Sequence, residues 1–123
     1  LFRTEEHLAP ILKKMVKDKY EDKYQMIETF PGTIELMTNG ISKGTGLKMY
    51  AKWNNIDLNH VIAFGDNEND NSLLKASGWG VCLKDGNPKT KQIADAITDY
   101  DCLDGGVGHY LFDHILNNKN IQF

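Results

Sequence analysis

The stretch that decides the fold reads Val61-Ile62-Ala63-Phe64-Gly65-Asp66-Asn67-Glu68-Asn69-Asp70. Its first four residues are an unbroken apolar run, which is typical of a strand buried on both faces of a parallel sheet. The run ends at Gly65-Asp66, and polar residues then lead into a helix predicted from about Asn69 to Ala76. Ligands of open parallel sheets bind beyond the carboxyl ends of the strands. The sequence therefore predicts a ligand site around Asp66.

Strands and helices alternate on both sides of this stretch, which predicts an α/β fold. The expected elements are a helix capped by Ser42 and running to about Trp53, a strand at Gly80 to Leu83, a helix from Pro88 to about Ala94, a short strand at Ala96 to Thr98, and a helix from Val107 to Leu116. Such alternation implies right-handed crossovers and a parallel sheet covered by helices.

The first forty residues have a different pattern. A helix is expected from about Thr4 to Asp18, with Pro10 either delaying its start or kinking it. Two strand-like runs around Pro31-Gly32 predict a hairpin, with strands at Tyr24 to Phe30 and Thr33 to Thr38. The pattern breaks at Gly40, so we expect one domain over residues 1–40 and another over residues 41–123.

Composition restricts the class of protein. The 123 residues are 41% hydrophobic and 25% charged, as in folded globular proteins. A formal net charge of -3 argues against non-specific nucleic-acid binding. The sequence has no apolar stretch of ~18 residues and no signal peptide, so neither a membrane span nor secretion is expected. Two cysteines, Cys82 and Cys102, are too few for a disulfide scaffold, which favours a reduced, cytoplasmic setting. Because the chain begins with Leu1, we expect a fragment of a longer protein.

The polar loop after the central strand suits a phosphate and a metal ion. Asp66 is expected to project from the strand end, and Asn69 and Asp70 lie where a helix start favours anions. Mg²⁺ usually takes one or two carboxylates, waters and phosphate oxygens. A calcium loop is rejected, because Asn71 stands where that loop needs Gly and Ser77 where it needs Glu. A polar loop in which an aspartate only caps the helix stays open as the alternative.

Lys43 is the second candidate. It lies in Ser42-Lys43-Gly44-Thr45-Gly46, at the first turn of a predicted helix, where the helix macrodipole disfavours a positive charge. That cost is understandable if the lysine faces an anion. The glycines match neither a Walker loop nor a dinucleotide fingerprint. A solvated lysine is the alternative.

Two other polar groups carry less weight. His109 and His114 are five positions apart, which does not place two metal ligands on one helical face, so packing is the preferred interpretation. Asp99-Tyr100-Asp101 resembles a carboxylate pair, but no long apolar strand precedes it, and we interpret it as a loop.

Taken together, Ser42-Lys43-Gly44, about 20 residues, and then the Gly65-to-Asp70 loop resemble the third and fourth motifs of the haloacid dehalogenase-like (HAD) superfamily. The closest resemblance is to its Cof-like sugar-phosphatase branch and covers nearly all of residues 41–116, while residues 1–40 resemble the tail of that branch's cap domain. The resemblance implies an α/β fold. Its main part is a partial Rossmann-like HAD core, with a parallel sheet and flanking helices, after the C-terminal remnant of an α/β cap.

The resemblance also implies Mg²⁺-dependent hydrolysis of phosphomonoesters through an aspartyl-phosphate. The catalytic residues would be Lys43, Asp66 and Asp70. Asp66 and Asp70 would form the metal site, and Lys43 and Asn69 would bind the substrate phosphate. The substrate would be small and phosphorylated, a sugar phosphate or a nucleotide, with no nucleic-acid or membrane partner.

The family's nucleophile comes from an Asp-x-Asp-Gly-Thr motif that this chain lacks. We therefore expect no useful hydrolysis by the chain alone, and an exposed sheet edge that pairs with the missing half or with another copy. A non-catalytic phosphate-binding or interaction domain is the alternative function. A response-regulator receiver domain would need an acidic pair and a phospho-acceptor Asp in its first half, and neither is found.

Overall fold

The computed structural model describes residues 1–20 and 23–117. The chain divides into two units, Leu1–Ser42 and Lys43–Phe123. The division follows Ser42, two residues after the predicted boundary, and the assignment of the first unit to a cap domain stays a prediction. No helix of the described part is long and apolar enough to cross a membrane.

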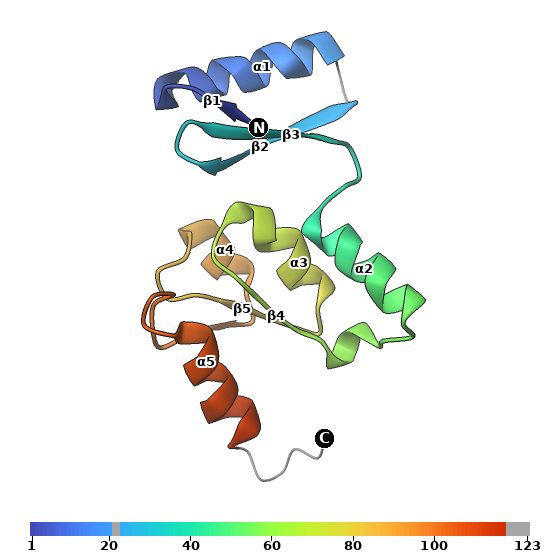
Figure 1. Ribbon diagram of the computed structural model, residues 1–123, viewed down its shortest axis with the longest axis vertical. Coiled ribbons are helices and arrows are strands. Elements are labelled where there is room, and N and C mark those ends of the chain that lie inside the picture. The colour runs from blue at the N-terminus through green and yellow to red at the C-terminus, as the bar shows by residue number, and fades with distance from the viewer. Residues whose placement is uncertain (21–22, 118–123) are drawn as a thin grey trace. The chain divides into compact units, whose positions relative to one another are not determined.

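The first unit is a three-stranded antiparallel sheet with one long helix (Figure 1). Its elements are β1 (Phe2–Arg3), the 3-10 helix η1 (Glu6–Leu8), α1 (Ala9–Tyr20), β2 (Tyr24–Phe30) and β3 (Thr33–Thr38), and the strand order is β1-β3-β2. The predicted hairpin is confirmed, with both strands at their expected bounds. Ile34 of β3 and Ala9 of α1 are fully buried in this unit.

The predicted start of the first helix at about Thr4 is wrong, whereas the alternative that Pro10 delays the start is confirmed. The α-helix begins at Ala9, with Pro10 as its second residue. An N–H group in the first turn of a helix has no acceptor within the helix, so proline, which lacks the N–H, is tolerated there. Pro10 therefore fits at this helix start. Residues before it form η1 and the unpredicted strand β1, whose Phe2 pairs with Ile34.

The second unit contains the predicted parallel sheet, in the order β4-β5-β6 (Figure 1). Its elements are α2 (Lys43–Trp53), η2 (Leu58–His60), β4 (Ile62–Gly65), η3 (Glu68–Asp70), α3 (Asn71–Ala76), β5 (Trp79–Cys82), α4 (Pro88–Ile93), β6 (Ala96–Ile97), α5 (Gly106–Leu111) and the π-helical turn η4 (Phe112–Leu116). The α/β fold is confirmed. Two predicted helices change character along their length, because the first begins as the 3-10 turn η3 and the last ends as the π turn η4.

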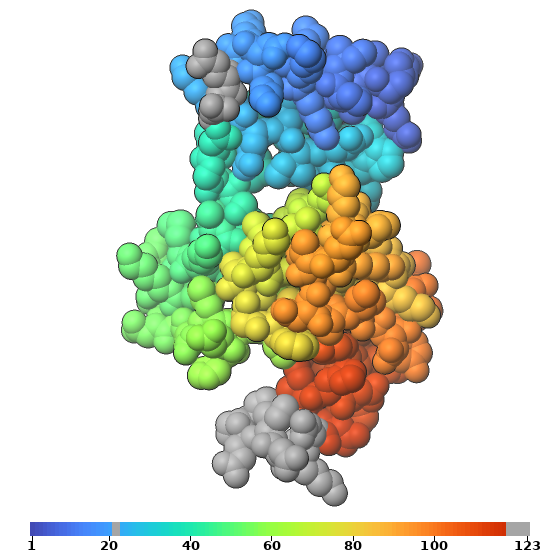
Figure 2. All heavy atoms as spheres, turned by 180° about the vertical axis from the view of Figure 1, so that it is seen from behind, coloured from blue at the N-terminus to red at the C-terminus, as the bar shows by residue number. Residues whose placement is uncertain are grey.

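Helices contact both faces of this sheet. Side chains alternate between the faces along a strand, so the register that pairs Ala63 with Gly80 places both on one face and Phe64 on the other. A Cβ on Gly80 would lie 2.8 Å from Leu74 Cβ, so α3 packs on the first face. Phe64 contacts Tyr110 of α5 on the second face, with 5.6 Å between ring centroids. In Figure 2 the green, yellow and orange surfaces of α2, α3 and α4 adjoin one another, in agreement with the contacts of α3 with α2 and α4.

Candidate active site at the carboxyl end of β4

The loop that follows β4 is fixed by its neighbour in the sheet. The Leu83 N–H donates to the Gly65 carbonyl at 3.0 Å, and the Asn87 N–H donates to the Asp66 carbonyl at 2.7 Å. These donors come from the segment that follows β5, whose carboxyl end lies beside that of β4 in the parallel pair. Asp66 therefore lies at the rim of the sheet, on backbone that is held by the segment after β5.

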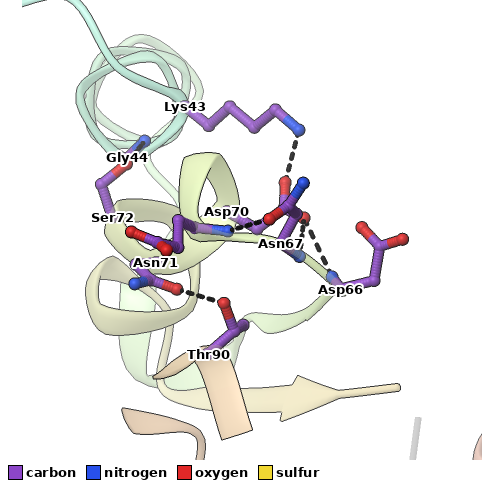
Figure 3. A network of polar contacts seen from close by, with 9 residues as sticks. Lys43, Gly44, Asp66, Asn67, Asp70, Asn71, Ser72 and Thr90 are labelled. Atoms are coloured by element: carbon purple, nitrogen blue, oxygen red, sulfur yellow. Dashed lines mark hydrogen bonds and ion pairs between the residues drawn. The ribbon is translucent and has the colours of Figure 1, made fainter. Parts of the chain in front are cut away.

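The Asp70 carboxylate is the centre of a polar network (Figure 3). One oxygen, Oδ2, accepts the N–H of Asp66 at 2.9 Å and the N–H of Asn67 at 3.2 Å. The other oxygen, Oδ1, accepts a hydrogen bond from the Lys43 ammonium. Only 7% of the Asp70 side chain is exposed, against 51% for Lys43. Asp70 thus shapes the loop and holds the lysine with the same carboxylate.

Asn67 completes this loop as the N-cap of η3. Its side chain accepts the Glu68 N–H at 2.8 Å and the N–H of Asp70, while Asp70 accepts the Asn67 N–H in return. This reciprocal pair is a capping box, which satisfies N–H groups that a helix start leaves without partners.

Gly65 is required by the same geometry. A Cβ at this position would lie 2.5 Å from Asp70 Cβ and 3.0 Å from Asp70 Cγ. The loop can fold back over the strand end only because residue 65 has no side chain.

The structure brings Lys43, Asp66 and Asp70 together. Lys43 begins α2 and, as expected at a helix start that disfavours its charge, it faces an anion, here Asp70. Asp66 lies next to both, with its backbone bonded to Asp70 and its carboxylate at the outer edge of the network in Figure 3. Asn69 lies half-buried in η3. The roles assigned to these four residues stay predictions.

The other polar candidates lie outside this network. His109 stacks on Tyr100 with ring centroids 4.2 Å apart, and His114 contacts Tyr110 at 4.3 Å. The packing interpretation of both histidines is therefore confirmed. Asp99 and Asp101 lie in the loop that follows β6, as expected.

The two carboxylates have opposite pKa shifts. Partial burial, together with the adjacent Asp70 carboxylate, raises the pKa of Asp66 above its ordinary value of 3.8. Burial also acts to raise the pKa of Asp70, but the Lys43 ammonium and the N–H groups of Asp66 and Asn67 outweigh it and lower that pKa. Neighbouring carboxylates with diverging pKa values are a common feature of sites that carry out acid–base chemistry.

Asp66→Asn is expected to raise the melting temperature of the chain at neutral pH. With a raised pKa, the folded state binds the Asp66 proton more tightly than the unfolded state, so the ionised group costs stability above that pKa. The cost shrinks as pH falls through the raised pKa and is absent below 3.8, where both states are protonated. Thermal unfolding at pH 7 and at pH 3 measures the difference.

The control for this substitution is Asp104→Asn, which changes an exposed carboxylate in the loop before α5. It should leave the melting temperature unchanged at both pH values. A lower melting temperature for Asp66→Asn at pH 7 would contradict the raised pKa.

The residues present fit a magnesium ion that is held mainly by one carboxylate. Among residues 1–20 and 23–117, no group of three or more His, Cys, Asp or Glu side chains could hold a metal by itself. Asp66 is only partly buried and is accessible to solvent, whereas Asp70 is occupied by Lys43 and two backbone N–H groups. Mg²⁺ commonly takes one or two protein carboxylates and completes its shell with waters and phosphate oxygens. The set therefore suits direct binding by Asp66, with Asp70 acting through the loop.

Sequence reasoning missed two contributors. Asn67 could have been found, because its spacing to Asp70 is that of a capping box. Ser72 could not have been found. Its hydroxyl accepts the N–H of Gly44 at 3.1 Å, and because Gly44 lies 28 positions earlier, no local sequence pattern indicates the contact.

Comparisons with known proteins agree with this geometry. The sequence model of the haloacid dehalogenase-like hydrolases matches residues 1–111. A Streptococcus pyogenes serotype M6 protein, provisionally named a phosphatase, is 34% identical over 104 residues, covering 85% of this chain and 38% of that protein. The phosphatase YwpJ of Bacillus subtilis is 40% identical over 73 residues, covering 59% of this chain and 26% of YwpJ.

A solved structure shows the same fold. The structure of a haloacid dehalogenase-like hydrolase from Bacillus subtilis superimposes with a TM-score of 0.78 at 30% identity, covering 93% of this chain and 39% of that one. The chain thus spans less than half the length of each of these relatives. With a family match over most of its length and a superimposable fold, the chain belongs to the haloacid dehalogenase-like hydrolases.

Proposed function

We propose that this chain is the C-terminal part of a magnesium-dependent phosphomonoester hydrolase. The observation that carries the proposal is the convergence of Lys43 and Asp66 on the Asp70 carboxylate at the rim of a parallel sheet. The phosphatase names of the Streptococcus and Bacillus relatives support it.

Each residue of the site has a physical task in this proposal. Phosphoryl transfer is promoted mainly by positioning and by charge stabilisation. Mg²⁺ held by Asp66, with support from Asp70, would supply charge to neutralise the phosphate oxygens. The Lys43 ammonium would add a second positive charge on the phosphate, and Asn69 would donate a hydrogen bond to it. The ion pair with the buried Asp70 holds the Lys43 ammonium at the rim of the sheet.

The proposed substrate is a small phosphorylated molecule, a sugar phosphate or a nucleotide, handled in the cytoplasm. A reducing compartment suits Cys82, which is fully buried and whose thiol pKa is raised by that burial. The formal net charge of -3 argues against non-specific binding to nucleic acid.

The chain alone is proposed to be inactive. Its 123 residues contain no Asp-x-Asp-Gly-Thr motif to supply a nucleophile and a general acid. In the described part of the chain β4 pairs only with β5, which leaves one edge of β4 unpaired beside the loop of Asp66. We propose that this edge pairs with the remainder of the enzyme or, when that is absent, with a second copy of the chain.

The test compares the complete protein with the isolated chain. The complete protein should hydrolyse a small phosphomonoester only with Mg²⁺, and the isolated chain should give no turnover above background. Asp66→Ala in the complete protein should lower kcat/KM by roughly 100-fold or more, since one preorganised electrostatic contact is lost. Asp104→Ala should leave kcat/KM unchanged. Full activity of Asp66→Ala, or robust turnover by the isolated chain, would refute the proposal.

The missing motif also favours a second candidate, a non-catalytic phosphate-binding domain with the same fold. The two candidates differ in the complete protein. A binding domain would retain inorganic phosphate without hydrolysing any phosphomonoester, and its upstream sequence would have no apolar strand ending in Asp-x-Asp.

A further inference from the structure

We infer that Ser72 is a positioning residue that sets Lys43 opposite Asp70. The Ser72 hydroxyl oxygen accepts the N–H of Gly44 at 3.1 Å. Ser72 lies in the first turn of α3 and Gly44 in the first turn of α2. The hydrogen bond therefore joins the starts of two helices that are far apart in the sequence.

This contact provides an acceptor for a backbone N–H at the start of α2. The first N–H groups of a helix have no partner inside it and need an acceptor from elsewhere. Gly44 is buried, so water cannot easily provide that acceptor. The Ser72 hydroxyl provides it, and losing it would leave a buried donor unsatisfied.

The same contact fixes the distance between the two helix starts. A Cβ on Gly44 would lie 2.3 Å from the Ser72 carbonyl oxygen and 3.0 Å from Ser72 Cβ. The backbone of α2 thus lies against α3 as closely as a residue without a side chain permits. A substantially longer separation would break the hydrogen bond.

The ion pair of the candidate site is attached to this contact at both ends. Lys43 immediately precedes Gly44, and Asp70 comes two residues before Ser72. The start of α3 is also held from its other side, because the Thr90 hydroxyl donates to Asn71 Oδ1 at 2.7 Å and Lys89 pairs with Glu68 at 3.4 Å. Loosening the Ser72 contact should therefore move Lys43 and leave the Asp70 loop in place.

The benefit of this arrangement rests on the proposed function. The Lys43 side chain is about half exposed, and a free lysine samples many rotamers. Because the backbone of Lys43 is already fixed beside Asp70, the lysine loses less conformational entropy when a phosphate binds. Electrostatic sites depend on such preorganisation. The positioning itself is a property of the chain without substrate and can be measured without turnover.

The test is a crystal structure of the 123-residue chain for each of a set of Ser72 variants, and the readout is the ion pair between the Lys43 ammonium and the Asp70 carboxylate. Ser72→Ala removes the acceptor, so Lys43 should move away and the ion pair should be lost. Ser72→Thr keeps the hydroxyl and should preserve the ion pair. Ser77→Ala is the matched control, because Ser77 is a half-buried serine at the other end of α3 whose hydroxyl donates to Leu74 O at 2.8 Å. It should leave the ion pair in place.

A purely structural serine would give a different result. If Ser72→Ala lowered the melting temperature but kept the ion pair between Lys43 and Asp70, the positioning role would be refuted. If Ser72→Ala did not fold, Ser72→Cys would replace it, since a thiol keeps the shape but accepts hydrogen bonds weakly. Ser72→Cys should lose the ion pair, and an intact ion pair would refute the inference. Inactivity of the complete enzyme would refute the proposed function without affecting either result.

Discussion

Gly44→Ala is expected to destabilise the chain, although alanine is the better helix former. Inside a helix, alanine is favoured over glycine by ~1 kcal/mol. Here the new Cβ would lie 2.3 Å from the Ser72 carbonyl oxygen and 2.6 Å from the Ser72 carbonyl carbon. Both are backbone atoms of a packed helix, and overpacking of this kind costs ~1–3 kcal/mol. The clash should exceed the gain in propensity, so the free energy of unfolding should fall.

Gly46→Ala, two residues further along the same helix, is the matched control. A Cβ there meets no atom within 4 Å, so only the propensity term acts. This variant should be more stable than the wild type by up to ~1 kcal/mol. Chemical denaturation of the three proteins gives the comparison. Equal effects of the two substitutions would show that α2 and α3 do not approach as closely as described.

Lys43→Met in the complete enzyme is expected to lower kcat/KM for a phosphomonoester by roughly 100- to 1,000-fold. Methionine keeps the length and apolar stem of the side chain but removes the charge that would face the phosphate. Losses of this size are typical when one preorganised electrostatic contact to a transition state is deleted. Steady-state kinetics at saturating Mg²⁺ measure the effect, and the loss should appear in kcat as well as in kcat/KM.

Lys48→Met is the control for this measurement. Lys48 is an exposed lysine on the same helix, and its loss changes the net charge by the same amount. Its kcat/KM should equal that of the wild type. Wild-type activity in Lys43→Met would mean that the lysine serves only to neutralise Asp70.

The fold and the placement of the candidate site could be predicted because their signals are local. A four-residue apolar run before Gly65-Asp66 is enough to indicate a buried parallel strand, and the strand-end rule then places Asp66 at the rim. Lys43 was found because its charge is unfavourable at a helix start. None of these deductions required knowledge of which distant residues meet.

The features that sequence reasoning missed depend on partners. The strand β1 has two residues and exists because Phe2 and Arg3 pair with Ile34 and Thr33 of β3, so it has no pattern of its own. The start of α1 was misplaced because Thr4 has the residue type of a helix cap, whereas the N–H of Thr4 donates to the Gly32 carbonyl at 2.7 Å. Ser72 has an ordinary helical position, and only its distance to Gly44 distinguishes it.

The double duty of the Asp70 carboxylate has a consequence for mutagenesis. Its two oxygens are divided between the backbone of residues 66 and 67 and the ammonium of Lys43. An asparagine at position 70 has a single acceptor oxygen, and an NH₂ group takes the place of the second oxygen. It can therefore accept hydrogen bonds either from the backbone of residues 66 and 67 or from Lys43, but not from both. Loss of activity in Asp70→Asn would not show whether the loop or the position of the lysine was responsible.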